Sequence, residues 1–404
     1  MSKRWNFKPI PSKEKIQQLS RAINVNEDLA KLLLQRGIHT HDEAKEFFCM
    51  EISNLHHPFL MKDMEKAVER LNLAIHRKEK IRFYGDYDVD GTTAVALCVS
   101  FLRQFYENVD FYVPDRYSEG YGVSQRGIEQ ALADGVGLLI TLDCGIKAFD
   151  KVDWCNQHKI DCIICDHHKP ETNVPKAIAV LDAKQHDCPY PYKELTGCGV
   201  GFKLMHAFCL KNKIDEAKIF QFIDYVAISI AADIVPITGE NRILMHKGLE
   251  IINQHPRIGI KALIEVAGFK SSLDVSNIVF GLAPRINAAG RIAHAYQAVK
   301  LLIADNEEEA KEYAKAVDER NDRRKDYDQQ ITAEALQMIV DLGWEQRKTT
   351  VLFKQDWHKG VVGIVASRCI EKYHRPTIIL TDSNGKIVGS ARSVPGFDIH
   401  EAIA

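Results

Sequence analysis

The sequence predicts an α/β protein in which a parallel-sheet domain is joined by a long helix to a smaller α/β domain. Two observations support this prediction. From about residue 80 onward, short apolar stretches alternate with helical ones, a pattern typical of a parallel sheet with helices on both faces. Residues 305–342 are highly charged and have the character of one long helix, as expected of a helix that bridges two domains.

Each element of this fold corresponds to a recognisable segment. Residues 13–50 and 64–78 have the apolar spacing of amphipathic helices. Residues 217–265 are expected to be mostly helical, and a second strand–helix–strand pattern begins after Gly343. Strands are expected at IRFYGDYD, VDFYVP, GLLITLDCG, DCIICDHH and AIAVLDA in the larger domain and at TTVLFKQD, PTIILTD and KIVGSARS in the smaller one. The expected domains are an N-terminal helical segment (1–78), the sheet domain (79–304), the connecting helix (305–343) and the smaller domain (344–404).

The composition narrows the class of protein. The 404 residues are 46% hydrophobic and 27% charged, which is ordinary for a soluble globular protein. A net charge of −2 argues against a purely electrostatic DNA binder, but it leaves a nucleic-acid enzyme with local positive charge open. No apolar run approaches about 18 residues, so neither a membrane span nor an export signal is expected. The cysteines are scattered, which favours free thiols in the cytoplasm.

Carboxylate and imidazole side chains gather where four of the apolar segments end. In open α/β sheets the carboxyl ends of the strands form the ligand crevice, so side chains delivered there from separate strands converge. The fourth segment, AISIAADIVP, is expected to be a buried helix rather than a strand. The residues concerned are Asp86, Asp88 and Asp90 after the first segment, Asp143 after the second, Asp166, His167 and His168 after the third, and Asp233 in the fourth.

These residue types in this arrangement predict a site for two metal ions. Each piece alone has a simpler interpretation, because a single DxDxD is often a solvated turn and an aspartate after a strand is often a helix N-cap. Together they would repel each other strongly unless cations neutralise them. Aspartate with histidine suits Mn²⁺ or Mg²⁺ better than a thiolate site would.

The wording of these motifs also resembles a known family. YGDYDVDGTTA, LDCG, DHHK and AADIVP, in this order, resemble the DHH phosphoesterase superfamily, which is named after a triplet like Asp166-His167-His168. PDRYSEGYGVS (114–124), APRINAAGR (283–291), WHKGVVGIVASR (357–368) and GSARS (389–393) resemble its RecJ branch of single-strand-specific exonucleases. The resemblance covers roughly residues 3–404, and it implies a DHH domain joined to a smaller DHH-associated domain.

The resemblance assigns roles to residues of the metal site. It implies that Asp143 bridges two ions, Mn²⁺ or Mg²⁺, and that His168 and Arg291 face the scissile phosphate. Smaller superfamily members have a histidine where this chain has Tyr84, so Asp86 is expected either to replace that ligand or to support the others. Asp166 is expected to orient a histidine. The implied metal ligands are Asp88, Asp90, Asp143, His167 and Asp233, joined by Asp86 if it replaces the missing histidine.

The implied chemistry is in-line attack on phosphorus. Two ions about 3.5–4 Å apart lower the pKa of the attacking water and stabilise both the attacking and the leaving oxygen. Arg291 and His168 would stabilise charge on the non-bridging oxygens.

The smaller domain is expected to bind the nucleic-acid backbone. Gly363 lies at a helix start that resembles a phosphate cradle, although a GxxG there, taken without the resemblance, is more often a sign of plain close packing. Arg368, Ser390 and Arg392 are the expected phosphate contacts. In the sheet domain, Tyr117 and Tyr121 are expected either to stack on bases, which tolerates any sequence, or to pack against the domain.

The resemblance implies a function and leaves two alternatives. It implies 5′ to 3′ digestion of single-stranded DNA with release of nucleoside 5′-monophosphates, a role in DNA repair and recombination, and a helicase and a single-strand-binding protein as partners. One alternative is a phosphodiesterase of short oligonucleotides or cyclic dinucleotides, and the other is a non-catalytic DNA-binding scaffold. The helical pattern of FDIHEAIA has no stop signal before Ala404, so an incomplete DHH-associated domain is also expected.

Overall fold

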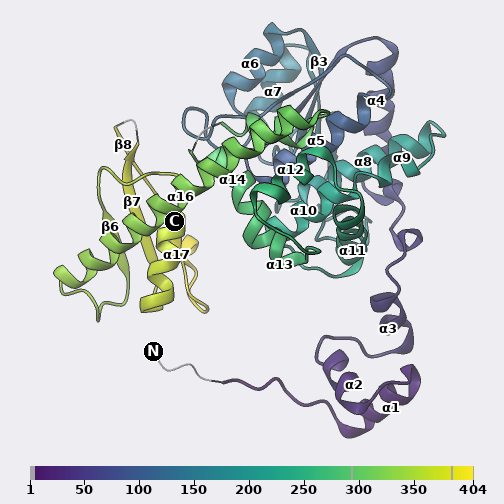
Figure 1. Cartoon of the computed structure of the whole chain (residues 1–404). Helices are drawn as coiled ribbons and strands as arrows, with labels where there is room; N and C mark the ends of the chain where they lie inside the picture. The colour runs from purple at the N-terminus through teal and green to yellow at the C-terminus, as the bar shows by residue number, and fades with distance from the viewer. Residues whose placement is uncertain (1–4, 293, 384, 404) are drawn as a thin grey trace.

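A five-stranded parallel sheet forms the centre of the larger domain in the computed structural model, which describes residues 5–292, 294–383 and 385–403 (Figure 1). The strand order is β2-β1-β3-β4-β5, and every neighbouring pair is parallel. The five predicted strands are therefore confirmed. Their bounds are β1 Lys80–Gly85, β2 Val109–Tyr112, β3 Val136–Leu142, β4 Asp161–Cys165 and β5 Ala179–Leu181.

Helices cover both faces of this sheet. One face packs against α4 (Met64–His76), α5 (Val89–Leu102), α8 (Gly197–Lys211) and α10 (Ile223–Asp233) in the main hydrophobic core. The other face packs against α6 (Gln125–Ala133) and α7 (Phe149–Gln157). Successive strand residues alternate between these cores, as Phe83 and Tyr84 do, because side chains on a strand point to opposite faces.

The remaining helices extend the main core or stand beside it. Helices α1, α2 and α3 form a small core of their own, whereas α4 packs directly on the sheet domain. A single turn with π-helical hydrogen bonds, η3, precedes α14. The bounds are α1 Lys13–Ile23, α2 Glu27–Leu34, α3 His41–Phe48, η1 Ile52–Asn54, η2 Pro58–Leu60, α9 Ala217–Phe220, α11 Gly239–Gln254, α12 Ile258–Val266, α13 Val275–Asn277, η3 Ile278–Leu282, α14 Ala283–Ile292 and α15 Tyr296–Leu302.

The predicted connecting helix is α16 (Glu307–Asp341), which runs from the sheet domain into the smaller domain (Figure 1). There, β6 (Thr350–Phe353) and β7 (Thr377–Ser383) are parallel, and β8 (Lys386–Arg392) is antiparallel to β7. Helix α17 (Val362–Tyr373) and the end of α16 cover one face of this sheet. The second α/β domain is thus confirmed, and a short helix, α18 (Ile399–Ile403), follows; Ala404 lies outside the described residues.

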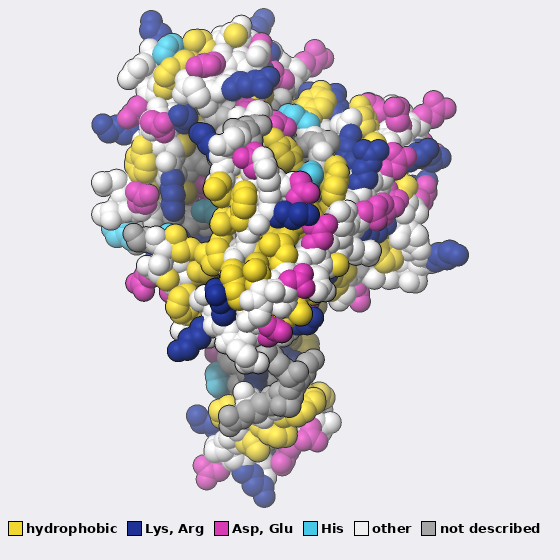
Figure 2. Space-filling model, turned by 90° about the vertical axis from the view of Figure 1, so that its left-hand side faces the viewer, with side chains coloured by type: hydrophobic (Ala, Val, Ile, Leu, Met, Phe, Trp, Pro, Cys, Tyr) yellow, Lys and Arg dark blue, Asp and Glu magenta, His cyan; other side chains and the backbone are white. Residues whose placement is uncertain are grey.

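The smaller domain also has apolar surface. Val351 and Phe353 on β6 and Ile387 on β8 are large hydrophobic side chains exposed to solvent. Figure 2 views the molecule from the side on which this domain lies in Figure 1, and apolar side chains gather in the middle of that view.

Within the described ranges, no helix is both long enough and apolar enough to span a membrane.

Candidate metal centre

The carboxyl ends of the central strands place a row of aspartates at one edge of the sheet. Asp86, Asp143 and Asp166 each directly follow the last residue of β1, β3 and β4. Their amides continue the strand ladder: Asp86 N–H donates to Leu142 (3.3 Å), Asp143 N–H to Cys165 (2.9 Å) and Asp166 N–H to Leu181 (3.0 Å). Because the chain order reverses between β1 and β3, this edge is the switch point where open α/β sheets bind ligands.

The first turn of α5 adds two more carboxylates. Asp88 is the N-cap of α5 and accepts a hydrogen bond from Gly91 N–H at 3.1 Å. Asp90, two residues further on, is buried and accepts hydrogen bonds from the amides of Gly197 and Cys198, both at 2.7 Å. The start of α8 therefore holds Asp90 in place, and Ser229 on α10 donates a further hydrogen bond to it at 2.7 Å.

The structure brings all six predicted metal residues together. His167 Nε2 lies 3.1 Å from Asp143, 3.5 Å from Asp90 and 3.7 Å from Asp233. As predicted, Asp233 ends a helix, α10, rather than a strand. Three groups have potential ligand atoms within 4.8 Å of one another: Asp86, Asp88 and Asp143; Asp90, His167 and Asp233; and Asp143, His167 and His168.

Asp143 occupies the centre of this arrangement in an unusual backbone conformation. Its φ is +59°, in the left-handed region that few residues other than glycine adopt. Gly197 leaves room for it, since a Cβ on that glycine would lie 2.5 Å from the Cβ of Asp143. Strained backbone of this kind persists only where the surroundings enforce it, and it clusters at functional sites.

The carboxylates raise one another's pKa values. Burial raises the pKa of Asp86 to about 8, and the charge of Asp88 adds to this. Burial raises the pKa of Asp143 well above its ordinary range, and Asp90 adds to the effect. Burial and the charges of Asp90 and Asp88 raise the pKa of Asp233 to about 7. A bound cation would remove this penalty because it favours the charged form of every carboxylate around it.

The donor set fits a divalent ion. Asp86 Oδ2 and Asp143 Oδ1 are buried oxygens with no hydrogen-bond partner among the described residues, and such atoms require an explanation such as an ion. Carboxylate oxygens with one imidazole nitrogen suit Mn²⁺ or Mg²⁺. His167 has a pKa lowered mainly by burial, so its ring favours the neutral form in which Nε2 can bind a metal.

His168 is held by two neighbours at the rim of the centre. Its Nδ1 lies 2.7 Å from Asp166, whose carboxylate also accepts the amides of Ile146 and His167. The hydrogen bond to Asp166 is the main reason that the pKa of His168 is raised. The hydroxyl of Tyr121 lies 3.1 Å from the other ring nitrogen. The predicted role of Asp166 is to orient a histidine, and this role requires the contact with His168 that the structure has.

Arg291 and Tyr117 meet where the two domains touch. The hydroxyl of Tyr117 donates to the carbonyl of Arg291, and the Arg291 guanidinium donates to Gly360 in the smaller domain at 3.4 Å. The ring of Tyr117 also packs edge-on against His358, which corresponds to the packed alternative left open for it. Burial, with repulsion from Arg116, lowers the pKa of Arg291 to about 10, so the guanidinium is still charged at neutral pH.

In the smaller domain, three of the four predicted backbone contacts lie together. A Cβ on Gly363 would lie 3.0 Å from Ser390 Oγ and 3.3 Å from the guanidinium of Arg392, and Arg392 donates to Ser390 at 3.0 Å. Arg368 is engaged elsewhere, with Glu371 at 3.2 Å.

Two polar residues near the centre were not singled out in the sequence, and one that was lies apart from the cluster. Tyr84 is buried and its hydroxyl bonds to Ser124. Asp182 directly follows β5 and is buried, with a pKa that burial raises to about 7; its strand-end position was the available signal. Asn287, within APRINAAGR, accepts the first amide of α5 at 3.1 Å.

Two domain families match this chain. The DHH family, N-terminal domain, matches residues 80–230, and the DHHA1 domain matches residues 346–404. These ranges correspond to the sheet domain and to the smaller domain.

Curated proteins named as single-stranded-DNA-specific exonucleases match over almost the whole chain. The single-stranded-DNA-specific exonuclease RecJ of Bacillus subtilis (strain 168) is 38% identical over 404 residues, which is 99% of this chain and 50% of that protein. RecJ of Escherichia coli (strain K12) is 35% identical over 417 residues, 97% of this chain and 71% of its own length. The chain thus spans half the length of the first relative and about seven-tenths of the second.

Solved structures match as well. RecJ from Thermus thermophilus in complex with Mn²⁺ has a TM-score of 0.84 and 27% identity, covering 99% of this chain and 56% of that one. An exonuclease RecJ bound to manganese has a TM-score of 0.76 and 30% identity, covering 87% of this chain and 86% of that one. From the identity shared with curated relatives and the two matched domains, this chain belongs to the RecJ family.

Proposed function

We propose that this chain carries the catalytic centre of a metal-dependent exonuclease that hydrolyses single-stranded DNA. The observation that carries the proposal is the convergence of five aspartates, Asp143 among them, and His167 at the sheet edge. The relatives named as single-stranded-DNA-specific exonucleases support the substrate.

The proposed cofactor is a pair of Mn²⁺ or Mg²⁺ ions that share Asp143. The manganese-bound relatives support a divalent metal, and the overlapping groups of ligand atoms support two ions rather than one. When bound, the ions would lower the pKa of a water and stabilise the attacking and leaving oxygens. One ion would be held by Asp86, Asp88 and Asp143, and the other by Asp90, Asp143, His167 and Asp233.

The chain's own groups would position and neutralise the phosphate. His168 keeps a proton more readily than a free histidine because Asp166 is hydrogen-bonded to it. A ring nitrogen of His168 lies within 4.8 Å of side-chain ligand atoms of Asp143 and His167. The protonated ring would therefore place positive charge beside a non-bridging oxygen of a phosphate bound there. Arg291 would supply a second cation there, and preorganised charges of this kind act mainly on the transition state.

The smaller domain would guide the strand to the centre. Gly363 has no side chain to crowd the hydroxyl of Ser390 and the guanidinium of Arg392, which lie next to it, and this pair of donors is suited to phosphate. Arg368 would join them by giving up its ion pair with Glu371 and binding a phosphate instead. Tyr121, with its exposed ring beside His168, is the proposed base-stacking residue, whereas Tyr117 would hold the domain junction.

The family resemblance supports the remaining parts of the proposal. These are a 5′ to 3′ direction, release of nucleoside 5′-monophosphates, action in DNA repair and recombination in the cytoplasm, and a helicase and a single-strand-binding protein as partners.

The test is digestion of end-labelled single-stranded DNA by the purified chain with Mn²⁺, Mg²⁺ or EDTA. We expect stepwise loss of nucleotides with either metal, none with EDTA, and faster digestion of long strands than of dinucleotides. Label position assigns the direction. A preference for dinucleotides or cyclic dinucleotides would favour the small-substrate phosphodiesterase instead. Binding of single strands without any metal-dependent cleavage would contradict the enzymatic proposal and favour a scaffold.

A further inference from the structure

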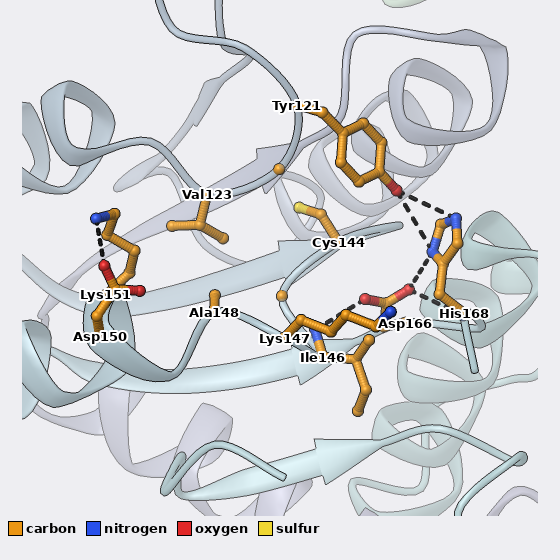
Figure 3. Close-up of a pocket in the computed structure, with 12 residues that line it drawn as sticks. Tyr121, Val123, Cys144, Ile146, Lys147, Ala148, Asp150, Lys151, Asp166 and His168 are labelled. Carbon is orange, nitrogen blue, oxygen red and sulfur yellow. Dashed lines mark hydrogen bonds and ion pairs between the residues drawn. The ribbon is translucent and has the colours of Figure 1, made fainter. Parts of the chain in front are cut away.

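A pocket opens beside the metal centre and reaches away from it along the sheet edge (Figure 3). Its volume is about 300 Å³, the lower end of the range for small-molecule sites. One wall is the segment 121–123 before α6, and the floor is the loop 144–148 between β3 and α7. His168 and Asp166 close the end that faces the metal residues.

The pocket is tied rigidly to the centre. The amide of Ile146 in the floor donates to Asp166 Oδ2 at 2.9 Å, and the opposite oxygen of this carboxylate holds His168. Tyr121 in the wall reaches His168 through its hydroxyl. Any group seated between wall and floor therefore lies next to a phosphate bound at His168.

The lining of the pocket is apolar on two opposing sides. Val123 in the wall and Ala148 in the floor face each other across it (Figure 3), and the buried residues Cys144 and Ile146 complete the floor. The exposed ring of Tyr121 lies beside His168, at the end that faces the metal residues (Figure 3). Opposing apolar side chains beside an aromatic ring suit a nucleobase, because every base has a π-face that can pack against them.

The charge of the lining fits an anionic ligand. Lys151 is paired with Asp150 at 2.6 Å. Lys147 is exposed and has no carboxylate within ion-pair distance among the described residues. An ammonium group at the rim is thus available to a phosphate outside the pocket.

We propose that this pocket binds the nucleoside attached to the phosphate at the metal centre, with its base between Val123 and Ala148 and with Lys147 at a neighbouring phosphate. This inference rests on the proposed function, since it takes the ligand to be a deoxynucleotide. Val123 and Ala148, the side chains proposed to face the base, are apolar and cannot read its hydrogen-bonding edge, so purines and pyrimidines should both bind.

The test measures binding rather than cleavage. Titration calorimetry with saturating Mn²⁺ compares dAMP, dTMP and 2-deoxyribose 5-phosphate, which has the same phosphate but no base. Wild type should bind both nucleotides at least about tenfold more tightly than the sugar phosphate, because stacking contributes that much. Ala148→Trp, which fills the pocket, should remove this preference while leaving sugar-phosphate binding unchanged.

A matched control and a second variant keep the result interpretable. Ala217 is an exposed alanine at the start of α9, outside the pocket lining, so Ala217→Trp should keep the wild-type preference. If Ala148→Trp does not fold, Val123→Phe fills the pocket from the opposite wall and should give the same loss.

The outcomes separate this inference from the proposed function. If wild type binds nucleotides and the sugar phosphate equally, or if both filled variants keep the preference, the pocket assignment is wrong even when the chain cleaves DNA. If the preference is present and sensitive to filling but no DNA is cleaved, the pocket assignment holds and the proposed exonuclease activity fails.

Discussion

Asp143 combines three features that rarely occur together in one residue. Its side chain is buried, its backbone is in the left-handed region, and its carboxylate lies among other acids that raise its pKa. Each feature is unfavourable in a chain without metal, because burial of like charges and backbone strain both lower the free energy of unfolding. A shared ligand of two cations is the role that accounts for all three.

Asp143→Asn tests this role with little disturbance of the backbone. Asparagine tolerates positive φ well, so the variant should fold and, without metal, unfold at a temperature no lower than wild type. It should bind Mn²⁺ at least about a hundredfold more weakly and lose cleavage to a similar degree, since it lacks the shared charge. Calorimetric Mn²⁺ titration measures this, with the exposed Asp153→Asn as the control. Retention of more than about a tenth of wild-type activity would contradict the bridging role.

The pKa of Asp86 predicts how pH acts on the metal-free chain. Folding raises this pKa from its ordinary value of 3.8 to about 8, so the folded chain holds a proton that the unfolded chain releases. For an acid with a raised pKa, stability is highest at low pH and falls as pH rises towards the folded pKa.

Between about pH 7 and pH 9, the free energy of unfolding, measured by thermal unfolding in EDTA, should therefore fall by about 1 kcal/mol because of Asp86. This pH range is used because histidines titrate mainly below it. Saturating Mn²⁺ should remove the loss, and Asp86→Asn without metal should remove the part that comes from Asp86, so its pH dependence should be smaller than that of wild type. An identical pH dependence in wild type and in Asp86→Asn would show that Asp86 is ionised in the folded chain.

The first turn of α8 acts as the support on which the metal centre is built. Its amides hold Asp90, and its first residue, Gly197, lets the backbone of Asp143 approach. Two glycines in this turn differ in what a methyl group would meet. At Gly197 it would lie 2.5 Å from the Asp143 Cβ, whereas at Gly199 the nearest atom would be 3.4 Å away.

Gly197→Ala and Gly199→Ala thus form a matched pair. The first should lower stability by about 1–3 kcal/mol, as overpacking does, and should weaken Mn²⁺ binding by displacing Asp143. The second should leave both unchanged or slightly increase stability, because alanine favours helices. Equal effects of the two substitutions on Mn²⁺ affinity would mean that α8 does not position Asp143.

Elements were predictable from the sequence where the signal is local. The strands and the helical end of AISIAAD follow from apolar patterning, and α16 follows from its long charged sequence. The metal residues follow from the convergence of strand ends. The supports of those residues depend on segments far apart in the chain. Asp90 and Cys198 are 108 residues apart, and Tyr117 and Arg291 are 174 apart, so only the packed structure shows that they meet.

The two domains and the connecting helix place the recessed candidate metal centre near the proposed phosphate-binding surface of the smaller domain. Asp143 and His167 are buried, and the contacts of Arg291 with Tyr117 and Gly360 join the domains beside them. A flexible single strand can bring a phosphate down to such a centre, whereas a duplex carries its phosphates on the outside of a wide, stiff rod.

Single-stranded DNA should therefore be digested more than about tenfold faster than a blunt duplex of the same sequence, since opening each pair adds to the barrier. Arg392→Ala should weaken single-strand binding and reduce its salt dependence by about 0.7 in log–log slope, the value for one phosphate contact. Rates compared at fixed salt with labelled substrates measure the first effect, and a salt titration measures the second. Equal rates on the two substrates would contradict the recessed geometry.

The proposed metal centre depends most of all on two divalent ions that share Asp143. Anomalous diffraction at the manganese edge from crystals of the chain grown with Mn²⁺ tests it most directly. We predict two peaks about 3.5–4 Å apart, one on each side of the Asp143 carboxylate, and the loss of both in Asp143→Asn. A single peak, or peaks that do not touch Asp143, would contradict the account.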